Sequence, residues 1–151
     1  MDYKIIEKFK RISTLQSVYN NKYLYGAIKN VPGSKLTPIQ SNVLSFLANF
    51  GDTTIGRLAE STSTSTNYLS NAIKGLYKNN LIERYQKHNN LRFVYLKLTE
   101  EGSRLYNERQ EYSTIFLNQQ LSKIANEEEV EKMTECLKYV YEILKRLDNC
   151  D

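Results

Sequence analysis

The stretch at residues 61–76, STSTSTNYLSNAIKGL, changes character halfway along. Its first six residues alternate Ser and Thr without any apolar side chain, which is typical of a flexible linker. After Asn67 the apolar residues recur at helical spacing, at Leu69, Ala72, Ile73 and Leu76. The stretch is therefore either a joint between two segments or the turn and first residues of a helix that contacts a partner.

The predicted helix has a second face, which is polar, slim and basic. Such a face is either simply solvated or a contact surface, and the Ser and Thr residues before it are suited to cap the helix and to meet phosphates. An Asn side chain can bond adenine through two hydrogen bonds, and a Lys can reach guanine or phosphate. The candidate DNA-contacting residues here are Thr64, Ser65, Thr66, Asn67, Tyr68, Ser70, Asn71 and Lys74.

Composition describes an ordinary globular chain. It has 151 residues, 40% of them hydrophobic and 25% charged, which excludes a disordered polymer and suits either one domain with a sizeable core or a small domain with a helical extension. No apolar run approaches the roughly 18 residues that a membrane span needs, and the N-terminus lacks the apolar core of a signal peptide. We therefore expect a cytoplasmic protein without a membrane partner.

Charge is distributed unevenly along the sequence. Residues 1–100 carry 14 Lys and Arg against 6 Asp and Glu, a net charge of +8. Residues 101–151 carry 7 against 11, a net charge of −4. A polyanion would therefore bind the first part of the chain.

Two helices are predicted before the opening stretch. Apolar residues near heptad spacing, including Ile5, Phe9 and Ile12, indicate a long helix from residue 2 to about residue 29, which NVPGS at 30–34 ends. In the next segment Thr37 can cap a helix, Pro38 suits its first position, and Gln40 completes a capping box. An apolar stripe follows as far as Phe50, Gly51 and Asp52 end the helix, and residues 53–60 fit a short helix with Ile55, Leu58 and Ala59 facing inward.

A hairpin and two more long helices are predicted after the stretch. Residues 81–86 and 92–98 are rich in Ile, Tyr, Phe, Val and Leu, and the polar KHNN joins them. LTEEG at 98–102 opens one long helix, and Asn126 with Glu129 caps another. The expected fold is mainly α with a small β-hairpin wing, and the expected domains are a dimerisation helix at 1–33, a winged helix-turn-helix at 34–100 and dimerisation helices at 101–151.

The middle of the chain resembles a known family. LTPIQSNVLSFLA, TIGRLAE, LYKNNLIER and LRFVYLKLTEEG, in this order, are similar to the core of the MarR family of bacterial transcription regulators. The resemblance implies a homodimer with interlocked first and last helices, whose two winged domains straddle a pseudo-palindromic double-stranded DNA operator. It also implies that Arg92 is the wing arginine that enters the minor groove. The sequence departs from the family at Asn71, usually basic, at Asn80, usually Gly, and at Asn90, usually Asp.

Several candidate residues keep two interpretations. In the predicted hairpin turn, Lys87 is a candidate phosphate contact, and His88 is either a turn residue or a phosphate contact. Aromatic residues either line a pocket for a small aromatic effector or pack in an interface; they are Tyr19, Tyr23, Tyr25 and Tyr68. We expect Cys136 to fill a core or interface and Cys150 to be a tail thiol. The sequence disfavours redox sensing, because the relatives that sense oxidants use a cysteine of the first helix, where this chain has none.

Two function classes follow from these observations. The first is a sequence-specific DNA-binding transcription regulator, a dimeric repressor that a small effector releases. The alternative is a winged-helix module for protein interaction, in which the basic face is only solvated. We expect no enzyme, metal or cofactor, since the sequence lacks a phosphate-binding glycine loop, a nucleophile elbow and an HExxH motif, and has a single His.

Overall fold

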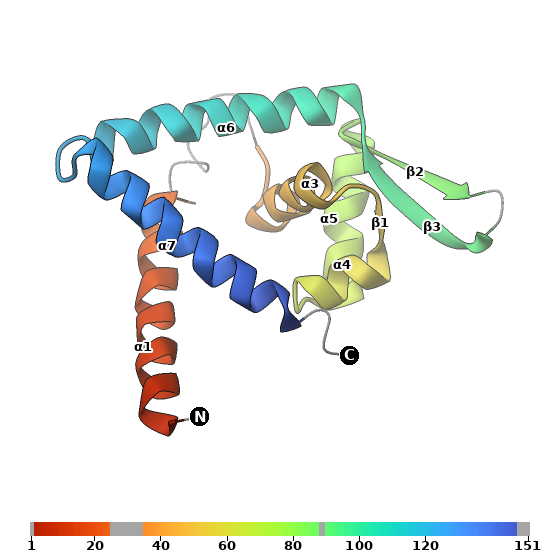
Figure 1. Cartoon of the computed structure of the whole chain (residues 1–151). Coiled ribbons are helices and arrows are strands. Elements are labelled where there is room, and N and C mark those ends of the chain that lie inside the picture. Colours follow the sequence, from red (N-terminus) through yellow and green to blue (C-terminus); the bar gives the residue numbers. More distant parts are fainter. Residues whose placement is uncertain (1, 25–34, 88–89, 148–151) are drawn as a thin grey trace. The chain divides into compact units, whose positions relative to one another are not determined.

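The computed structural model describes residues 2–24, 35–87 and 90–147, and it divides the chain into two compact units, residues 1–113 and 114–151 (Figure 1). Its architecture is mostly helical with a small antiparallel sheet, which confirms the predicted fold class. The elements are α1 (Tyr3–Tyr19), the π-helical turn η1 (Asn20–Leu24), α3 (Pro38–Phe50), β1 (Thr53–Thr54), α4 (Ile55–Ser61), α5 (Thr66–Lys78), β2 (Ile82–Lys87), β3 (Asn90–Leu98), α6 (Glu100–Leu121) and α7 (Glu127–Lys145).

Helix α1 exposes an apolar surface. The Asp2 carboxylate accepts a hydrogen bond from the Lys4 N–H at 2.9 Å and caps the helix. The α-helical part ends at Tyr19, earlier than the sequence predicted, and η1 continues the helical path to Leu24. The predicted break at 30–34 lies outside the described residues. No α1 side chain is buried, and Ile12 is 63% exposed.

Helix α3 begins as the sequence predicted. The Thr37 hydroxyl accepts from the Gln40 N–H at 3.3 Å, and the Gln40 side-chain oxygen accepts from the Thr37 N–H at 2.9 Å. Gly51 ends the helix with a φ of 77°, a conformation that favours glycine. The buried stripe ends before Phe50, which is 67% exposed and packs on Phe46 with ring centroids 4.8 Å apart.

The core of the winged domain lies among three helices and the sheet. Helices α3, α4 and α5 surround it, and the base of β2 and β3 closes it (Figure 1). Side chains from each element are almost completely buried, namely Val43, Leu44, Leu58, Leu69, Ile73, Leu76, Ile82 and Leu96. Burying one such side chain contributes about 1.5–3 kcal/mol, so this cluster is the main source of the domain's stability.

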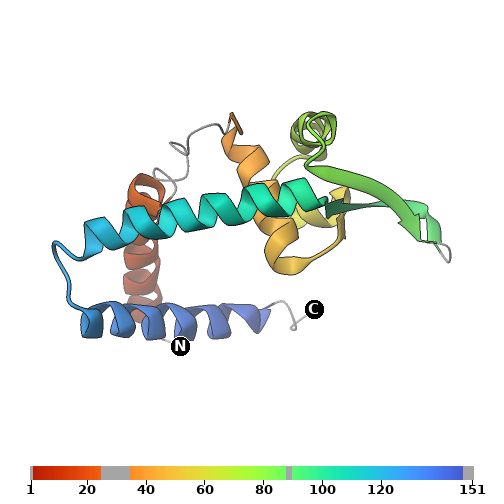
Figure 2. The ribbon, with the colours of Figure 1, turned by 90° about the horizontal axis from the view of Figure 1, so that it is seen from above.

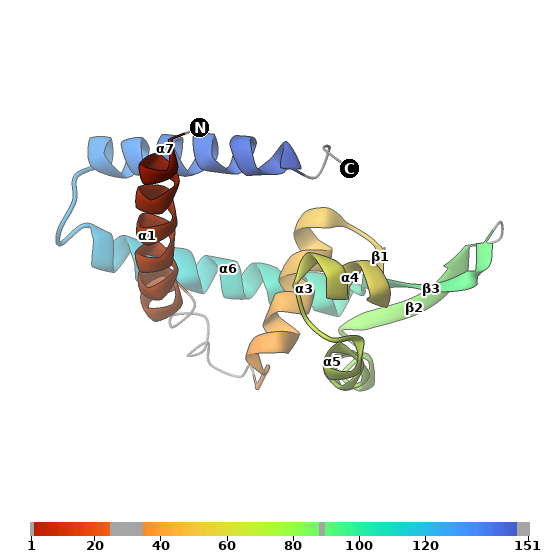
Figure 3. The same ribbon diagram turned by 90° about the horizontal axis from the view of Figure 1, so that it is seen from below.

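The sheet has three strands rather than the predicted two. Its order is β1-β3-β2, with both pairs antiparallel, and Thr53 and Thr54 of β1 pair with Leu96 and Tyr95 of β3. A strand of two residues is too short to show alternation, so sequence analysis missed it. Strands β2 and β3 run on beyond the helices as a hairpin, which is the wing (Figures 2 and 3).

Helix α6 starts against the end of α5. The Thr99 hydroxyl accepts from the Gly102 N–H at 2.9 Å and donates to the Asn80 carbonyl at 2.6 Å, while the Thr99 N–H donates to the Leu81 carbonyl at 3.2 Å. Gly102 lies so close to this turn that a Cβ there would overlap the Leu81 carbonyl oxygen. Thr99 therefore caps α6 and ties it to the segment between α5 and the wing.

Further along α6, a buried arginine contacts α3. Arg109 is 6% exposed, and its guanidinium donates to the Ser41 hydroxyl at 2.9 Å. Burial lowers the pKa of this guanidinium, because removal from water disfavours the charged form. The sequence did not single out Arg109, since its neighbours give no sign that this charge is buried.

The unit at residues 114–151 contains the end of α6 and the whole of α7. The predicted capping box is present, because Asn126 and Glu129 exchange side-chain to backbone hydrogen bonds of 2.9 Å. No residue of α7 is buried in the structure, and several of its apolar residues are exposed, including Met133, Leu137 and Leu144.

Two glycine substitutions should shift stability in opposite directions. Gly102→Ala should destabilise the domain by about 1–3 kcal/mol, because the added methyl group must push the backbone of Leu81 away. Gly56→Ala is the matched control. A Cβ at this helical position meets no atom within 4 Å, so alanine should stabilise the protein by roughly 0.5–1 kcal/mol. Urea unfolding followed by circular dichroism measures both, and equal midpoints for Gly102→Ala and the unmodified chain would contradict the close approach.

Candidate DNA-binding surface

The Ser and Thr repeat at residues 61–66 forms a tight turn between two helices. Ser61 ends α4, and the Thr64 N–H donates to the Ala59 carbonyl at 2.9 Å while the Ser63 N–H donates to the Glu60 carbonyl at 3.1 Å. This pair of hydrogen bonds is the Schellman motif, which needs a left-handed residue, and Ser63 has a φ of 49°. The repeat is therefore the turn of a helix-turn-helix and not a linker.

The hydroxyl groups of the turn hold its geometry. Thr62 donates to the Leu58 carbonyl at 2.7 Å, and Thr64 donates to the Thr62 carbonyl at 3.0 Å. Ser65 caps α5, accepting from the Tyr68 N–H at 3.3 Å. Helix α5 begins at Thr66, one residue before the predicted start. The first N–H groups of α5 have no carbonyl partner within the helix, so its N-terminus can receive an anion.

Helix α5 separates apolar from polar side chains as predicted. Its apolar stripe is buried, with Leu69, Ile73 and Leu76 completely shielded from solvent. Its other side exposes Asn67, Asn71, Lys74 and Lys78, which we call the reading face. The two flanking residues differ: Tyr68 is 60% exposed, whereas Ser70 is half-buried and donates its hydroxyl proton to the Thr66 carbonyl at 2.7 Å.

The end of α5 explains one departure from the family pattern. Asn80 has a φ of 56°, the left-handed conformation in which the family has glycine. The Asn80 N–H donates to the Tyr77 carbonyl and the Leu81 N–H to the Leu76 carbonyl, both at 3.0 Å. This is a second Schellman motif, and Asn is the residue that tolerates its left-handed position best after Gly. The departure at Asn80 thus preserves the turn.

One face of the wing continues the buried side of the sheet, and we call it the core-side face. Beyond the core, this face carries a basic side chain. Arg84 pairs with the buried Leu96, and its guanidinium lies over the Tyr77 ring of α5, 5.2 Å from the centroid. Arg92 lies farther out on β3, in the stretch between Val94 and Asn90 where the pairing with β2 shifts register. Arg92 is exposed, and sequence analysis identified it but missed Arg84. The sequence signal that could have identified Arg84 is its basic side chain two positions after the buried Ile82, because residues two apart in a strand lie on the same face.

Lys87 lies beside Tyr95, on the face of the wing opposite its core-side face. Its ammonium group is 4.3 Å from the centroid of the Tyr95 ring, and the register of the hairpin shifts between Gln86 and Lys87. His88 lies outside the described residues, as does Tyr25.

At its base, this opposite face carries a polar cluster. The Tyr85 hydroxyl donates to an Asp52 carboxylate oxygen at 2.7 Å, and this hydrogen bond to the carboxylate raises the pKa of Tyr85 to about 12. The Lys97 ammonium pairs with Glu83 at 2.9 Å, which raises the pKa of Lys97. An open cleft of about 360 Å³ adjoins the cluster and is lined by Leu47, Ala48, Asp52, Lys97, Leu98, Ser103, Tyr106 and Asn107.

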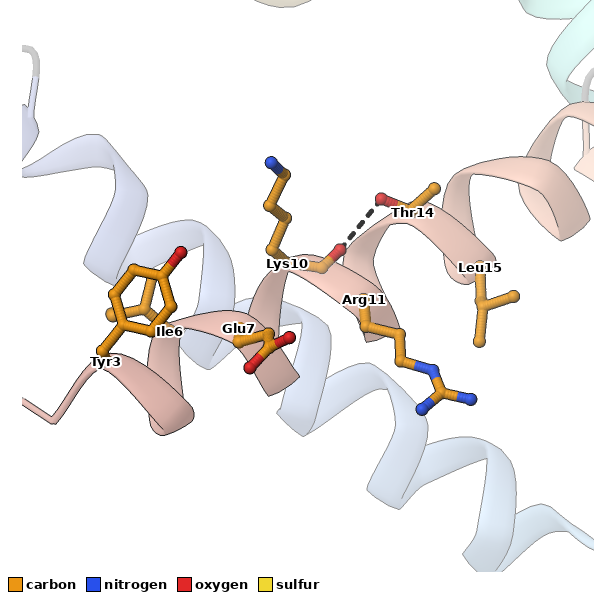
Figure 4. Close-up of a pocket in the computed structure, with 7 residues that line it drawn as sticks. All are labelled: Tyr3, Ile6, Glu7, Lys10, Arg11, Thr14 and Leu15. Carbon is orange, nitrogen blue, oxygen red and sulfur yellow. Dashed lines mark hydrogen bonds between the residues drawn. The ribbon is translucent and has the colours of Figure 1, made fainter.

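The candidate effector residues of the first helix are exposed. Tyr19 and Tyr23 stack with ring centroids 6.2 Å apart, and the Lys22 ammonium lies 4.9 Å from the centroid of the Tyr23 ring. Earlier in α1 a shallow groove is lined by side chains of that helix alone, including Tyr3, Ile6 and Leu15 (Figure 4). Tyr68 lies on α5, and its place in an effector pocket stays a prediction.

Neither metal binding nor membrane insertion has support in the described part of the chain. Residues 2–24, 35–87 and 90–147 contain no group of three or more His, Cys, Asp or Glu arranged to hold a metal ion. Over the same residues, no helix combines the length and the apolar character of a bilayer span.

Three helices followed by a hairpin, with the third helix exposing a polar face, define a winged helix-turn-helix domain. Residues 36–94 match the model of the MarR family, which confirms the resemblance seen in the sequence. No curated protein sequence matches the chain at a significant level.

Solved structures show the same fold over nearly the whole chain. A MarR family protein from Bacillus stearothermophilus is 20% identical, covers 96% of this chain and 99% of its own, and superimposes with a TM-score of 0.74. Wild-type MarR from E. coli is 23% identical, with 85% and 95% covered and a TM-score of 0.72. BpsR from Bordetella bronchiseptica, whose DNA binding is regulated by 6-hydroxynicotinic acid, is 20% identical, with 87% and 98% covered and a TM-score of 0.63.

The hydroxyl of Tyr85 should titrate about two pH units above a free tyrosine, whose pKa is about 10. Because the folded-state pKa is the higher one, the hydrogen bond to Asp52 stabilises the fold below pH 10 and is lost as the pH rises through about 12. Asp52→Ala should lower the midpoint, since alanine removes the acceptor of the hydrogen bond. An NMR titration of the labelled tyrosine ring carbons measures it, and an unchanged midpoint in Asp52→Ala would exclude this cause.

Proposed function

We propose that this chain is a sequence-specific DNA-binding transcription regulator, a dimeric repressor that binds a pseudo-palindromic operator and is released by a small effector. The observation that carries the proposal is the arrangement of α5. One side of this helix is locked in the core, and the other presents Asn67, Asn71, Lys74 and Lys78 to solvent. This arrangement supports regulation by DNA binding, and not catalysis, as the function.

In this proposal the reading face enters the major groove. Asn67 and Asn71 lie four residues apart, so they project from the same side of the helix toward neighbouring base pairs. Each can accept from and donate to an adenine edge, and Lys74 can reach guanine or phosphate. Thr64, Ser65, Thr66, Tyr68 and Ser70 surround these side chains and contact the phosphates beside the groove.

The wing supplies the second set of contacts. Arg92 enters the adjacent minor groove, which is narrow and strongly negative over A·T tracts. Arg84 lies on the core-side face of the wing beside Tyr77 of α5, where its guanidinium can meet the phosphate backbone between the two grooves. Lys87, with His88 beside it in sequence, contributes a charge at the wing tip that attracts DNA without reading its bases.

Apolar surface supports the homodimer. The exposed fraction is 60% for Ile5, 63% for Ile12 and 65% for Leu147, side chains that belong to α1 and to the segment after α7. A soluble monomer rarely leaves such extended apolar faces uncovered, and a second copy of the same helices would cover them. In the dimer, Cys136 is interface filler, and the two winged domains meet the two half-sites of the operator.

For the effector we propose a small aromatic acid that contacts Tyr19, Tyr23 and Tyr68. The control of BpsR by 6-hydroxynicotinic acid supports this class of ligand. Tyr19 and Tyr23 already stack, and Lys22 beside them supplies a positive charge for a carboxylate. The effector would act by shifting the population of spacings between the winged domains. We place the whole assembly in the cytoplasm, where the operator lies.

Three alanine variants should weaken DNA binding in three different ways. Asn71→Ala should cost about 1–3 kcal/mol on the true operator and little on random duplex, as expected for a base contact. Arg92→Ala should weaken operators with A·T flanks more than those with G·C flanks. Lys87→Ala should weaken all sequences alike and reduce the salt slope by roughly one unit. Fluorescence anisotropy on matched duplexes, at several salt concentrations, measures all three.

The same titration separates the two function classes. A DNA-binding regulator should show a steep fall of log affinity with log salt, whereas a protein-interaction module should bind duplex weakly and without sequence preference. An Asn71→Ala variant that loses affinity equally for operator and random DNA would show that α5 does not read sequence. The operator can be identified by sequencing the fragments of its own genome that the protein binds.

Removal of residues 127–151 should abolish dimerisation and operator binding together. The deleted segment contains all of α7, whose exposed apolar residues we assign to the dimer interface. Analytical ultracentrifugation gives the mass, and circular dichroism checks that the winged domain stays folded. A folded, monomeric truncation that binds the operator as tightly as the full chain would refute the dimeric architecture.

A further inference from the structure

The wing is attached to the domain core asymmetrically. Strand β3 is the central strand of the sheet and pairs with β1, whereas β2 is an outer strand that, within the described residues, pairs with β3 alone. Buried Ile82 and Leu96 fix the base of the hairpin in the core. Beyond them the outer strand needs another attachment if its angle to the helices is to be defined.

Tyr85 provides such an attachment. It lies on the outer strand β2, and its hydroxyl reaches past β3 to donate to the Asp52 carboxylate at 2.7 Å. Asp52 follows Gly51, whose left-handed backbone turns the chain at the end of α3. The bond therefore joins the outer strand directly to the end of a core helix, 33 positions away in sequence.

The Tyr85 ring is also the inner end of a ladder of side chains. It contacts Tyr95 on the facing strand, with ring centroids 5.6 Å apart, and Lys97 lies 5.7 Å from its centroid. Lys87 lies over Tyr95, so the contacts continue outward from Asp52 through two rings to an ammonium group near the wing tip. Aromatic and cation–aromatic contacts of this kind resist relative motion of the strands.

We infer that Tyr85 is a positioning residue for the wing, holding it at one angle to α5 through its hydrogen bond to Asp52. Arg92 lies three residues beyond Tyr95, the partner of Tyr85, on the outer part of β3. A small rotation at the level of Tyr85 therefore displaces Arg92 appreciably. This inference rests on the proposed function, since it makes the reach of Arg92 into the minor groove depend on the bond.

The test compares two variants that each remove one hydroxyl group. Tyr85→Phe keeps the ring ladder and removes only the bond to Asp52. Tyr95→Phe is the matched control, because no hydrogen bond of its hydroxyl occurs among residues 2–24, 35–87 and 90–147. Full-length protein is used throughout, and the readouts are amide hydrogen exchange and anisotropy on operators with A·T or G·C flanks.

We expect Tyr85→Phe to speed exchange in β2 about threefold, as loss of one modest hydrogen bond implies, with α5 unchanged. Its preference for A·T over G·C flanks should fall by a similar factor, while Tyr95→Phe matches the unmodified protein in both readouts. In the Asp52→Asn variant the amide oxygen can still accept the bond, so the flank preference should be largely retained.

Each contrary outcome overturns a distinct claim. Unchanged exchange in Tyr85→Phe, or an equal effect of Tyr95→Phe, shows that the bond does not hold the wing. Faster exchange with an unchanged flank preference shows that wing position does not control Arg92. If the unmodified protein binds no duplex, the proposed function fails and the inference about Arg92 fails with it, whereas the exchange data still report whether the bond fixes the wing.

Discussion

The burial of one side of α5 is the constraint on which the rest of the winged domain depends. Leu69, Ile73 and Leu76 contact side chains of α3, α4 and the sheet and have no exposed surface. Rotating the helix by even a quarter turn would place Asn71 or Lys74 among these apolar groups, and burying an unpaired amide or ammonium is costly. The core thereby fixes which side chains α5 presents to solvent, and the candidate DNA contacts follow from this orientation.

A Schellman motif lies on each side of α5, one at the end of α4 and one at the end of α5 itself. Each motif has a residue other than glycine in its left-handed position. Ser63 occupies it before the helix and Asn80 after it. The strain of such a residue is compensated by the hydrogen bonds around it, which involve Thr62, Thr64 and Thr99. The same Thr99 caps α6, so the end of the reading helix, the base of the wing and the start of the long helix share one polar junction.

Much of this organisation could be predicted from the sequence because the signals are local. A capping box needs only residues three apart, and those at Thr37 and Asn126 are both present in the structure. The apolar stripe of α5 and the alternation of β3 are likewise periodic over short windows. Strand β1 and the burial of Arg109 could not be predicted, because each depends on a partner distant in sequence.

By itself, the sequence determined the order of helices and strands, the residues that cap them and the division of α5 into a buried and a polar side. These properties depend on hydrogen bonds and periodicities within a few residues. Only the tertiary structure decided that Lys87 lies over Tyr95 and that Tyr85 meets Asp52. The physical reason is register: a shift of one residue in strand pairing, as occurs between Gln86 and Lys87, changes which side chains face each other, and no local pattern encodes that shift.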